Sequence, residues 1–110
     1  RHARNGTLFT STGRLVLRHA RYADDGQPPD ERCGCYTCTR FSRAYLRHLL
    51  IAREPLAVTL NTLHNLTYYQ TLMRKLRAAI AGDVFAVFAA GVLRPAMAAE
   101  EEEGPLPCPA

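Results

Sequence analysis

The stretch "DERCGCYTCTRFSRAYLRHL", residues 30–49, places three cysteines close together, just before a segment with helical periodicity. Residues two or three apart rarely meet disulfide geometry, so Cys33, Cys35 and Cys38 are not expected to pair with one another. Thiolates at this spacing can instead wrap one metal ion, and zinc is typically held by Cys and His. The stretch therefore predicts a metal site in a reducing compartment. The alternative is that the cysteines are small buried side chains without a ligand.

A fourth ligand must come from downstream, where His48 and His64 are the candidates. His48 lies about two and a half helical turns beyond Cys38, which separates the two by roughly 15 Å along a rigid helix. His64 follows the connection at residues 54–59, so the chain can fold back and bring it to the cysteines. Three thiolates and one imidazole leave no open position, which favours a structural site over a catalytic one. The predicted ligands are Cys33, Cys35, Cys38 and His64.

The composition is that of a small globular domain with a basic bias. The chain has 110 residues, of which 47% are hydrophobic and 22% are charged, and its net charge is +4. These values argue against global disorder, and a domain of this length often needs a staple such as a metal. Most of the arginines fall in residues 1–53, whereas residues 100–103 form an acidic run. A phosphate-rich partner is compatible with this charge, and so is charge that serves solubility alone.

The periodicity predicts a β-hairpin followed by helices. Residues 1–23 alternate, with Leu8 and Leu15 on two strands and Gly13 in the turn, and residues 23–32 are rich in turn formers. Asp24, Asp25 and Asp30 are expected to be solvated there. Apolar spacing predicts one helix over residues 39–53, ended by Pro55.

A longer helix is predicted over residues 60–81, with Gly82 as its C-terminal stop. Asp83 is then expected to cap a short helix at residues 84–93. We expect four segments in all: a hairpin region at 1–23, a zinc-binding subdomain at 24–64, a helical part at 65–93 and a disordered tail at 94–110 that includes Cys108.

The beginning of the chain shows neither an initiator Met nor the apolar core of a signal peptide, and no run of about 18 apolar residues exists. We therefore expect a fragment of a cytoplasmic protein with no membrane partner. Outside the cysteine cluster, no phosphate-binding glycine loop or nucleophile–base pattern can be placed. The residues by themselves indicate a zinc-stapled, basic, helix-rich module.

Two longer stretches carry a family resemblance. "CGCYTCTRFSRAYLRHL" at 33–49 and "LNTLHNLTYYQTLMRKLRAAIAGDVF" at 60–85 closely resemble the C-terminal part of bacterial tRNA-guanine transglycosylase, also called queuine tRNA-ribosyltransferase. "ARNGTLFT" at 3–10 resembles a further stretch of that family, so the resemblance covers about residues 1–88. It implies the same four metal ligands.

The resemblance also implies a fold and an activity. Members of the family are α/β proteins built on a TIM barrel, with a zinc subdomain inserted near the last strand. They exchange guanine at the wobble position of tRNA for 7-aminomethyl-7-deazaguanine, a queuosine precursor, through an aspartate nucleophile. The matching aspartates would precede Arg1, and a barrel needs roughly 250 residues. This chain alone is therefore expected to be inactive.

Further site residues follow from the resemblance. Arg1 and Arg4 match basic residues that hold the tRNA anticodon stem-loop, although ordinary surface arginines are the alternative. Phe41, Tyr45 and His48, spaced i, i+4 and i+7, are expected with Leu60 in an aromatic homodimer interface. Simple core packing is the alternative for these residues. For the whole chain, the alternatives are a non-catalytic zinc module that binds RNA or a partner subunit, and a non-functional remnant.

Overall fold

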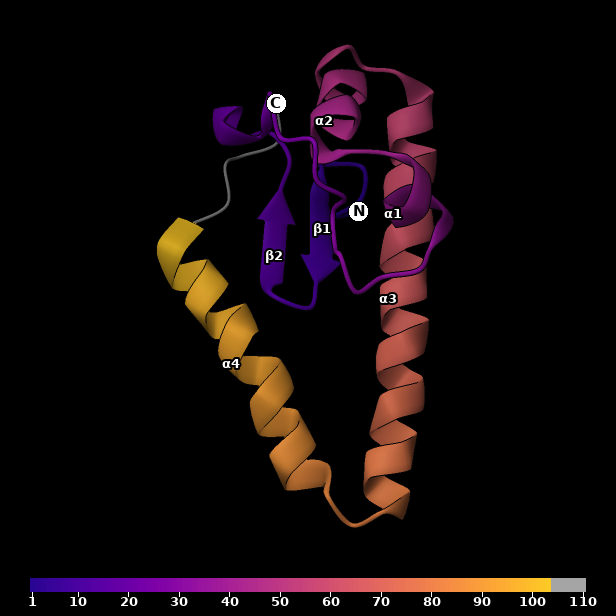
Figure 1. Ribbon diagram of the computed structural model, residues 1–110, viewed down its shortest axis with the longest axis vertical. Helices are drawn as coiled ribbons and strands as arrows, with labels where there is room; N and C mark the ends of the chain where they lie inside the picture. Colours follow the sequence, from indigo (N-terminus) through magenta and orange to yellow (C-terminus); the bar gives the residue numbers. More distant parts are fainter. Residues whose placement is uncertain (104–110) are drawn as a thin grey trace.

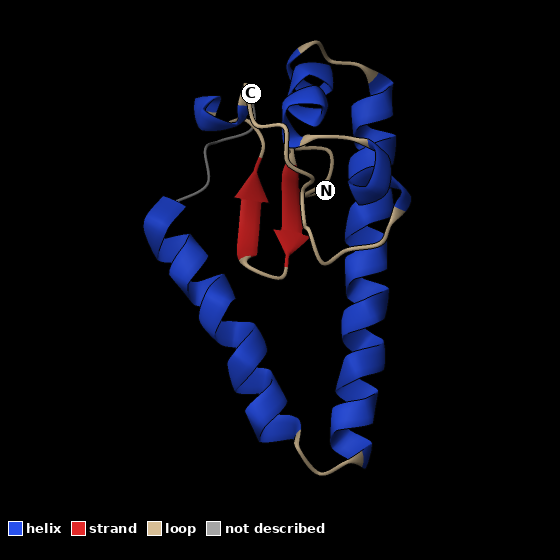
Figure 2. Ribbon diagram, in the orientation of Figure 1, coloured by secondary structure: helices blue, strands red, loops and turns tan. Residues whose placement is uncertain are grey.

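The computed structural model describes residues 1–103. A two-stranded sheet lies between a long helix and a second helix that folds back at an angle, as Figures 1 and 2 show. No helix in the described part of the chain is long and apolar enough to cross a membrane. The elements in chain order are β1 (Thr7–Thr10), β2 (Gly13–Val16), the 3-10 helix η1 (Ala20–Tyr22), α1 (Tyr36–Arg40), α2 (Arg43–Ile51), α3 (Pro55–Ala81) and α4 (Phe85–Glu103).

The predicted hairpin is confirmed. Strands β1 and β2 are antiparallel, with Leu8 opposite Leu15 and Thr10 opposite Gly13. Gly13 has φ 120°, a backbone conformation that residues with a Cβ rarely adopt, so glycine suits this end of the turn. Both leucines are buried, and the hairpin therefore presents one apolar face to the rest of the chain.

The single helix predicted over residues 39–53 is wrong, because the chain forms two helices there. Phe41 and Ser42 are both extended, and they separate α1 from α2. The Ser42 hydroxyl oxygen accepts a hydrogen bond from the N–H of Tyr45 at 3.1 Å and so caps the start of α2. This local cap, which satisfies an otherwise orphaned donor, interrupts a stretch whose apolar spacing alone resembles one helix.

Helix α3 is longer than predicted at its start and ends where predicted. It begins at Pro55, where the missing N–H of proline costs nothing, and Gly82 is its C-terminal cap. Asp83 lies at φ 57°, and the carbonyl of Val84 accepts the first α4 hydrogen bond, from the N–H of Phe88 at 3.1 Å. Asp83 therefore closes α3. The expectation that it caps the next helix is wrong.

Helix α4 is also longer than the predicted helix at 84–93. It continues to Glu103, so the disordered tail expected from residue 94 is wrong for residues 94–103. Residues 104–110, with Cys108, lie outside the described part of the chain.

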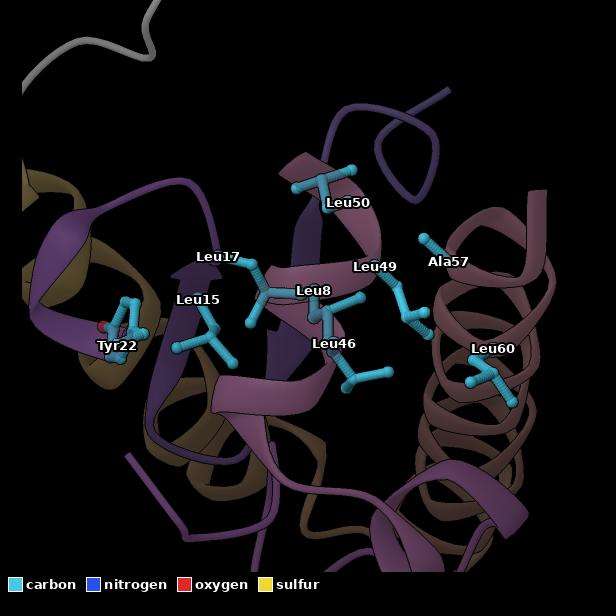
Figure 3. Packing of buried hydrophobic residues seen from close by; sticks show 9 residues of the cluster. All are labelled: Leu8, Leu15, Leu17, Tyr22, Leu46, Leu49, Leu50, Ala57 and Leu60. Carbon is cyan, nitrogen blue, oxygen red and sulfur yellow. The ribbon is translucent and has the colours of Figure 1, made fainter. Parts of the chain in front are cut away.

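One apolar cluster joins the hairpin to the helices. In Figure 3 its side chains converge from β1, β2, η1, α2 and the first turns of α3. Strand β1 lies next to α3 and β2 next to α4, so the sheet is covered from two sides. This packing sets α3 against the edge of β1, where the metal ligands meet. The cluster consists of Leu8, Leu15, Leu17, Tyr22, Leu46, Leu49, Leu50, Ala57 and Leu60.

Candidate metal centre

The cysteine loop is shaped by its own backbone before any ligand is considered. Cys35 is the N-cap residue of α1, and its sulfur accepts a hydrogen bond from the N–H of Cys38 at 3.3 Å. The N–H of Cys33 donates to the carbonyl of Asp30 at 3.1 Å. Cys35 and Cys38 are buried, and Cys33 is half-buried. The loop therefore holds the three sulfurs around the N-terminus of the short helix α1.

His64 completes the cluster from α3, and it has no exposed surface. Its Nδ1 lies 3.5 Å from the sulfur of Cys35 and 3.2 Å from that of Cys38. The ligand atoms of all four residues lie within 4.8 Å of one another. The geometry thus brings together the four ligands that the sequence predicts, and it leaves His48 on the exposed side of α2.

The hydrogen bond made by Nε2 of His64 determines the tautomer of the ring and leaves Nδ1 to face the sulfurs. Nε2 lies 2.7 Å from the backbone carbonyl oxygen of Phe9, which can only accept. Nε2 therefore carries the proton and donates it, so that the Nδ1 lone pair points to the cluster. Metal-binding histidines typically have such an outer partner, which orients the ring and makes it a stronger ligand.

Burial sets the protonation of the ligands. It raises the pKa of the Cys33 and Cys38 thiols and lowers the pKa of the His64 imidazole. Each of these side chains is therefore favoured in its neutral form by its surroundings. A divalent cation reverses this preference for the thiols, because it stabilises thiolates directly. The imidazole is already in the neutral form that a metal requires.

The donor set fits a soft or borderline divalent cation. Three sulfurs and one imidazole nitrogen make a closed tetrahedral set, the composition of structural zinc sites. No carboxylate belongs to the cluster, and carboxylate oxygens are the ligands that Mg²⁺ and Ca²⁺ prefer. The site therefore suits a structural metal ion better than a catalytic one.

Two asparagines beside His64 support the site, and the sequence analysis missed both. Asn65 accepts a hydrogen bond from the N–H of Phe9 at 3.1 Å and donates to the carbonyl of Thr7 at 3.0 Å. Asn61 donates to the carbonyl of Ala3 at 3.2 Å. The side chain of Asn65 pairs with the free edge of β1 as a third strand would, and that of Asn61 holds the segment that precedes β1. The signal was available, because polar residues at i, i+3 and i+4 of a helix share one face.

Asp30 ties the cysteine loop to the hairpin turn, which corrects the expectation that it is solvated. Its carboxylate accepts hydrogen bonds from the N–H of Ser11 at 2.8 Å, the hydroxyl of Ser11 at 2.9 Å and the N–H of Arg32 at 3.0 Å. Burial alone would raise the pKa of Asp30, but these three donors outweigh it and hold the pKa below 3.8. Asp25 also has a partner, Arg43, at 3.1 Å, and only Asp24 is exposed as expected.

Of the residues expected at a dimer interface, three lie at or near the surface and one lies in the core. The rings of Phe41 and Tyr45 stack with centroids 5.3 Å apart, although Phe41 precedes α2. Tyr36 joins them, 5.8 Å from Phe41, and His48 is exposed. Leu60, in contrast, is 2% exposed and belongs to the core, so it offers no surface to a second copy.

Arg1 and Arg4 lie together near the amino-terminal part of α3. Both are exposed, and with Ala3, Val58 and Thr62 they line a hollow at the surface. The structure thus keeps both arginines accessible at one hollow of the surface.

Comparison with known proteins gives the family. The sequence model of a family described as "Queuine tRNA-ribosyltransferase" matches residues 1–97. Proteins of that name are 60% identical over 85 residues in Syntrophobacter fumaroxidans and 63% identical over 81 residues in Acidithiobacillus ferrooxidans. These matches cover 77% and 74% of this chain, but only 23% and 22% of the two relatives. The chain thus spans about a quarter of their length, and it is similar to their C-terminal part. It belongs to the queuine tRNA-ribosyltransferase family.

Proposed function

We propose that this chain is the metal-stapled C-terminal part of an enzyme that replaces guanine at the wobble position of tRNA with 7-aminomethyl-7-deazaguanine. The observation that carries the proposal is the cluster of Cys33, Cys35, Cys38 and His64, in a chain whose residues 1–97 match the family. Because the chain spans about a quarter of its relatives, we assign the catalytic aspartates and the base pocket to the preceding part of the longer fold. This chain alone would then be inactive.

We propose zinc as the resident ion, in a structural role. When bound, zinc would supply four bonds that hold the cysteine loop to α3. The residues of the chain do the rest: His64 orients its ring on the carbonyl of Phe9, and Asp30 keeps the loop on the hairpin turn. This arrangement keeps the hairpin, and with it Arg1 and Arg4, in a fixed position relative to α3.

We propose tRNA and a second subunit as partners, in the cytoplasm. Arg1 and Arg4 are exposed and carry the planar guanidinium that suits phosphate, so they are assigned to the anticodon stem-loop. The stacked and partly exposed rings of Phe41 and Tyr45, with His48 beside them, form the proposed dimer face. Aromatic residues of this kind are enriched at protein interfaces.

A base-exchange assay tests the proposal. The chimera for this test is the full-length Syntrophobacter relative in which the matched C-terminal segment is replaced by the corresponding residues of this chain. We expect labelled guanine to enter tRNA with the chimera and not with the 110-residue chain alone. Exchange by the chain alone would show that the catalytic residues lie within it. A folded, metal-loaded chimera that exchanges no base would overturn the proposal.

A further inference from the structure

A cavity beside the metal cluster has no part in the proposed function. Its volume is about 230 Å³, and it is lined by the hairpin turn, the cysteine loop, the middle of α3 and the first half of α4. In Figure 1 the turn between β1 and β2 lies between α3 and α4, and both helices contact the hairpin. We call this space the interhelix cavity. Cys33, the half-buried member of the metal cluster, is one of its lining residues.

Part of the lining is apolar and suits an aromatic ring. Leu72 of α3 lines the cavity together with Phe88 and Val92 of α4, and all three are partly buried. The ring of Tyr68 also lines it and stacks on Phe9 with centroids 6.2 Å apart, which holds that ring in place. An apolar cavity of about 150 Å³ binds one benzene molecule in another protein. The interhelix cavity therefore has room for one ring and a small group attached to it.

The charged part of the lining is positive on balance. Lys75 and Arg32 both line the cavity, and neither side chain has an ion-pair or hydrogen-bond partner among the described residues. Asp30 is the only acidic residue of the lining, and its two oxygens already accept hydrogen bonds from Ser11 and from the N–H of Arg32. The ammonium and guanidinium groups therefore remain available to an anion, with which they can form charge-assisted hydrogen bonds.

We propose that the interhelix cavity binds a small aromatic anion. Its ring lies among Leu72, Phe88 and Val92, and its anionic group meets Lys75 and Arg32. Cations without the apolar lining would favour a bare anion, and the apolar lining without cations would favour a neutral ring. The volume sets the size, because pockets for drug-sized ligands span about 300–1,000 Å³. The inference goes beyond base exchange and uses none of the residues assigned to tRNA.

Phenyl phosphate is the probe, because it carries one ring and one phosphate group. We titrate the metal-loaded 110-residue chain and follow by NMR the amides of Gly34 and Gly91, which line the cavity from the cysteine loop and from α4. We expect both amides to shift with a Kd below about 1 mM. Inorganic phosphate and phenol, which each carry one half of the probe, should bind at least about tenfold more weakly.

Each failure of this titration has a definite meaning. Inorganic phosphate that binds as tightly as the probe would show a site for bare anions, and phenol that does so would show an apolar site. Either result would overturn the inference. Unshifted amides at Gly34 and Gly91 would overturn it as well, because the probe would then lie elsewhere.

A matched pair of variants tests the charge. Lys75→Gln and Arg77→Gln each remove one positive charge from an exposed position of α3, but only Lys75 lines the cavity. Both variants should therefore fold, which their Tm checks. We expect Lys75→Gln to weaken binding of phenyl phosphate by at least about fivefold and Arg77→Gln by less than about twofold. Equal effects would show that net charge alone attracts the probe, and the inference would fail.

Lys75 also gives a readout that needs no substitution, because it is the only lysine in the chain. Acetylation followed by peptide mass spectrometry therefore reports on this one side chain. Phenyl phosphate at ten times its Kd should slow the reaction roughly tenfold, and an unprotected Lys75 would overturn the inference. No tRNA is present in any of these measurements. A chimera that exchanges no base would thus leave the cavity untouched, and a chain that ignores the probe would leave the proposed function untouched.

Discussion

His64 joins two parts of the molecule through its two ring nitrogens. Nδ1 faces the sulfurs of Cys35 and Cys38, and Nε2 donates to the carbonyl of Phe9 in β1. Any ion held by the cluster is therefore tied to the hairpin as well as to the helices. The ring has no exposed surface, which leaves it little freedom to adopt another orientation.

Replacing His64 with alanine should abolish tight metal binding. The variant keeps three sulfurs but loses the fourth ligand, so we expect metal affinity to fall by at least about 100-fold. His48→Ala is the matched control, because His48 is exposed on α2 and should leave affinity unchanged. Competition with a chromophoric chelator measures both, and the assignment fails if the two variants behave alike.

Asp30 should make a contribution to stability that depends on pH. Its pKa is lowered in the folded chain, so its stabilisation is complete above the unfolded pKa near 3.8 and is lost as pH falls through the still lower folded value. Asp30→Asn replaces one acceptor oxygen with a donor, opposite the donors of Ser11 and Arg32. We expect the variant to be less stable than the wild type by about 1–3 kcal/mol at pH 7.

That difference should shrink as the pH is lowered towards 3, because the wild-type carboxylate also becomes protonated. The metal ligands titrate in both proteins, so comparing the two by urea unfolding isolates Asp30. A difference that stays constant from pH 7 to pH 3 would show that the carboxylate charge contributes nothing.

At the scale of elements, two helices end in the same way. After α2, Arg53 lies at φ 60°, its N–H donates to the carbonyl of Leu50, and the N–H of Glu54 donates to that of Leu49. After α3, Asp83 and Val84 repeat this pattern. This is the Schellman arrangement, which satisfies the last carbonyls of a helix and usually employs glycine at the left-handed position. Here both positions carry residues with a Cβ.

Arg53→Gly should therefore stabilise the chain. An L-residue in the left-handed region costs about 1–2 kcal/mol, and glycine removes this cost. Glycine also loses more conformational entropy on folding, which offsets part of the gain. We expect a gain of about 0.5–1 kcal/mol in the free energy of unfolding, measured in urea. Arg53→Ala is the control, since alanine removes the same side chain and keeps the backbone cost. A gain that is equal in both variants would point to the arginine side chain instead.

The sequence predicted some elements better than others, for physical reasons. The clustering of the three cysteines with His64 was predictable because the cysteines are adjacent in sequence and His64 follows a connection that can fold back to them. The hairpin was predictable because polar and apolar residues alternate on both sides of the turn at Gly13. The break before Ser42 was hidden by apolar spacing that continues across it. The role of Asn65 depends on the strand edge that it meets, which is known only once α3 and β1 are placed.

At the scale of the whole molecule, the core is small and the metal cluster lies at its border. Nine buried residues hold the hairpin to α2 and the start of α3, whereas the far half of α3 extends beyond them (Figures 1 and 3). A domain with so modest a core gains a large part of its stability from any staple. The cluster links residues 33–38 to His64 and, through Phe9, to β1.

Removal of the metal should therefore loosen one end of the molecule and leave the other. We expect excess chelator to lower Tm by more than about 10 °C, because binding to a preformed folded site contributes directly to folding. Limited proteolysis should then cut at Arg32 or Arg40, on either side of the cysteines, before it cuts at Arg74 or Arg77 in α3. Metal-loaded chain treated in the same way is the control. Identical melting and cleavage with and without chelator would show that the four ligands contribute no stability, and the assignment of a structural metal would fail.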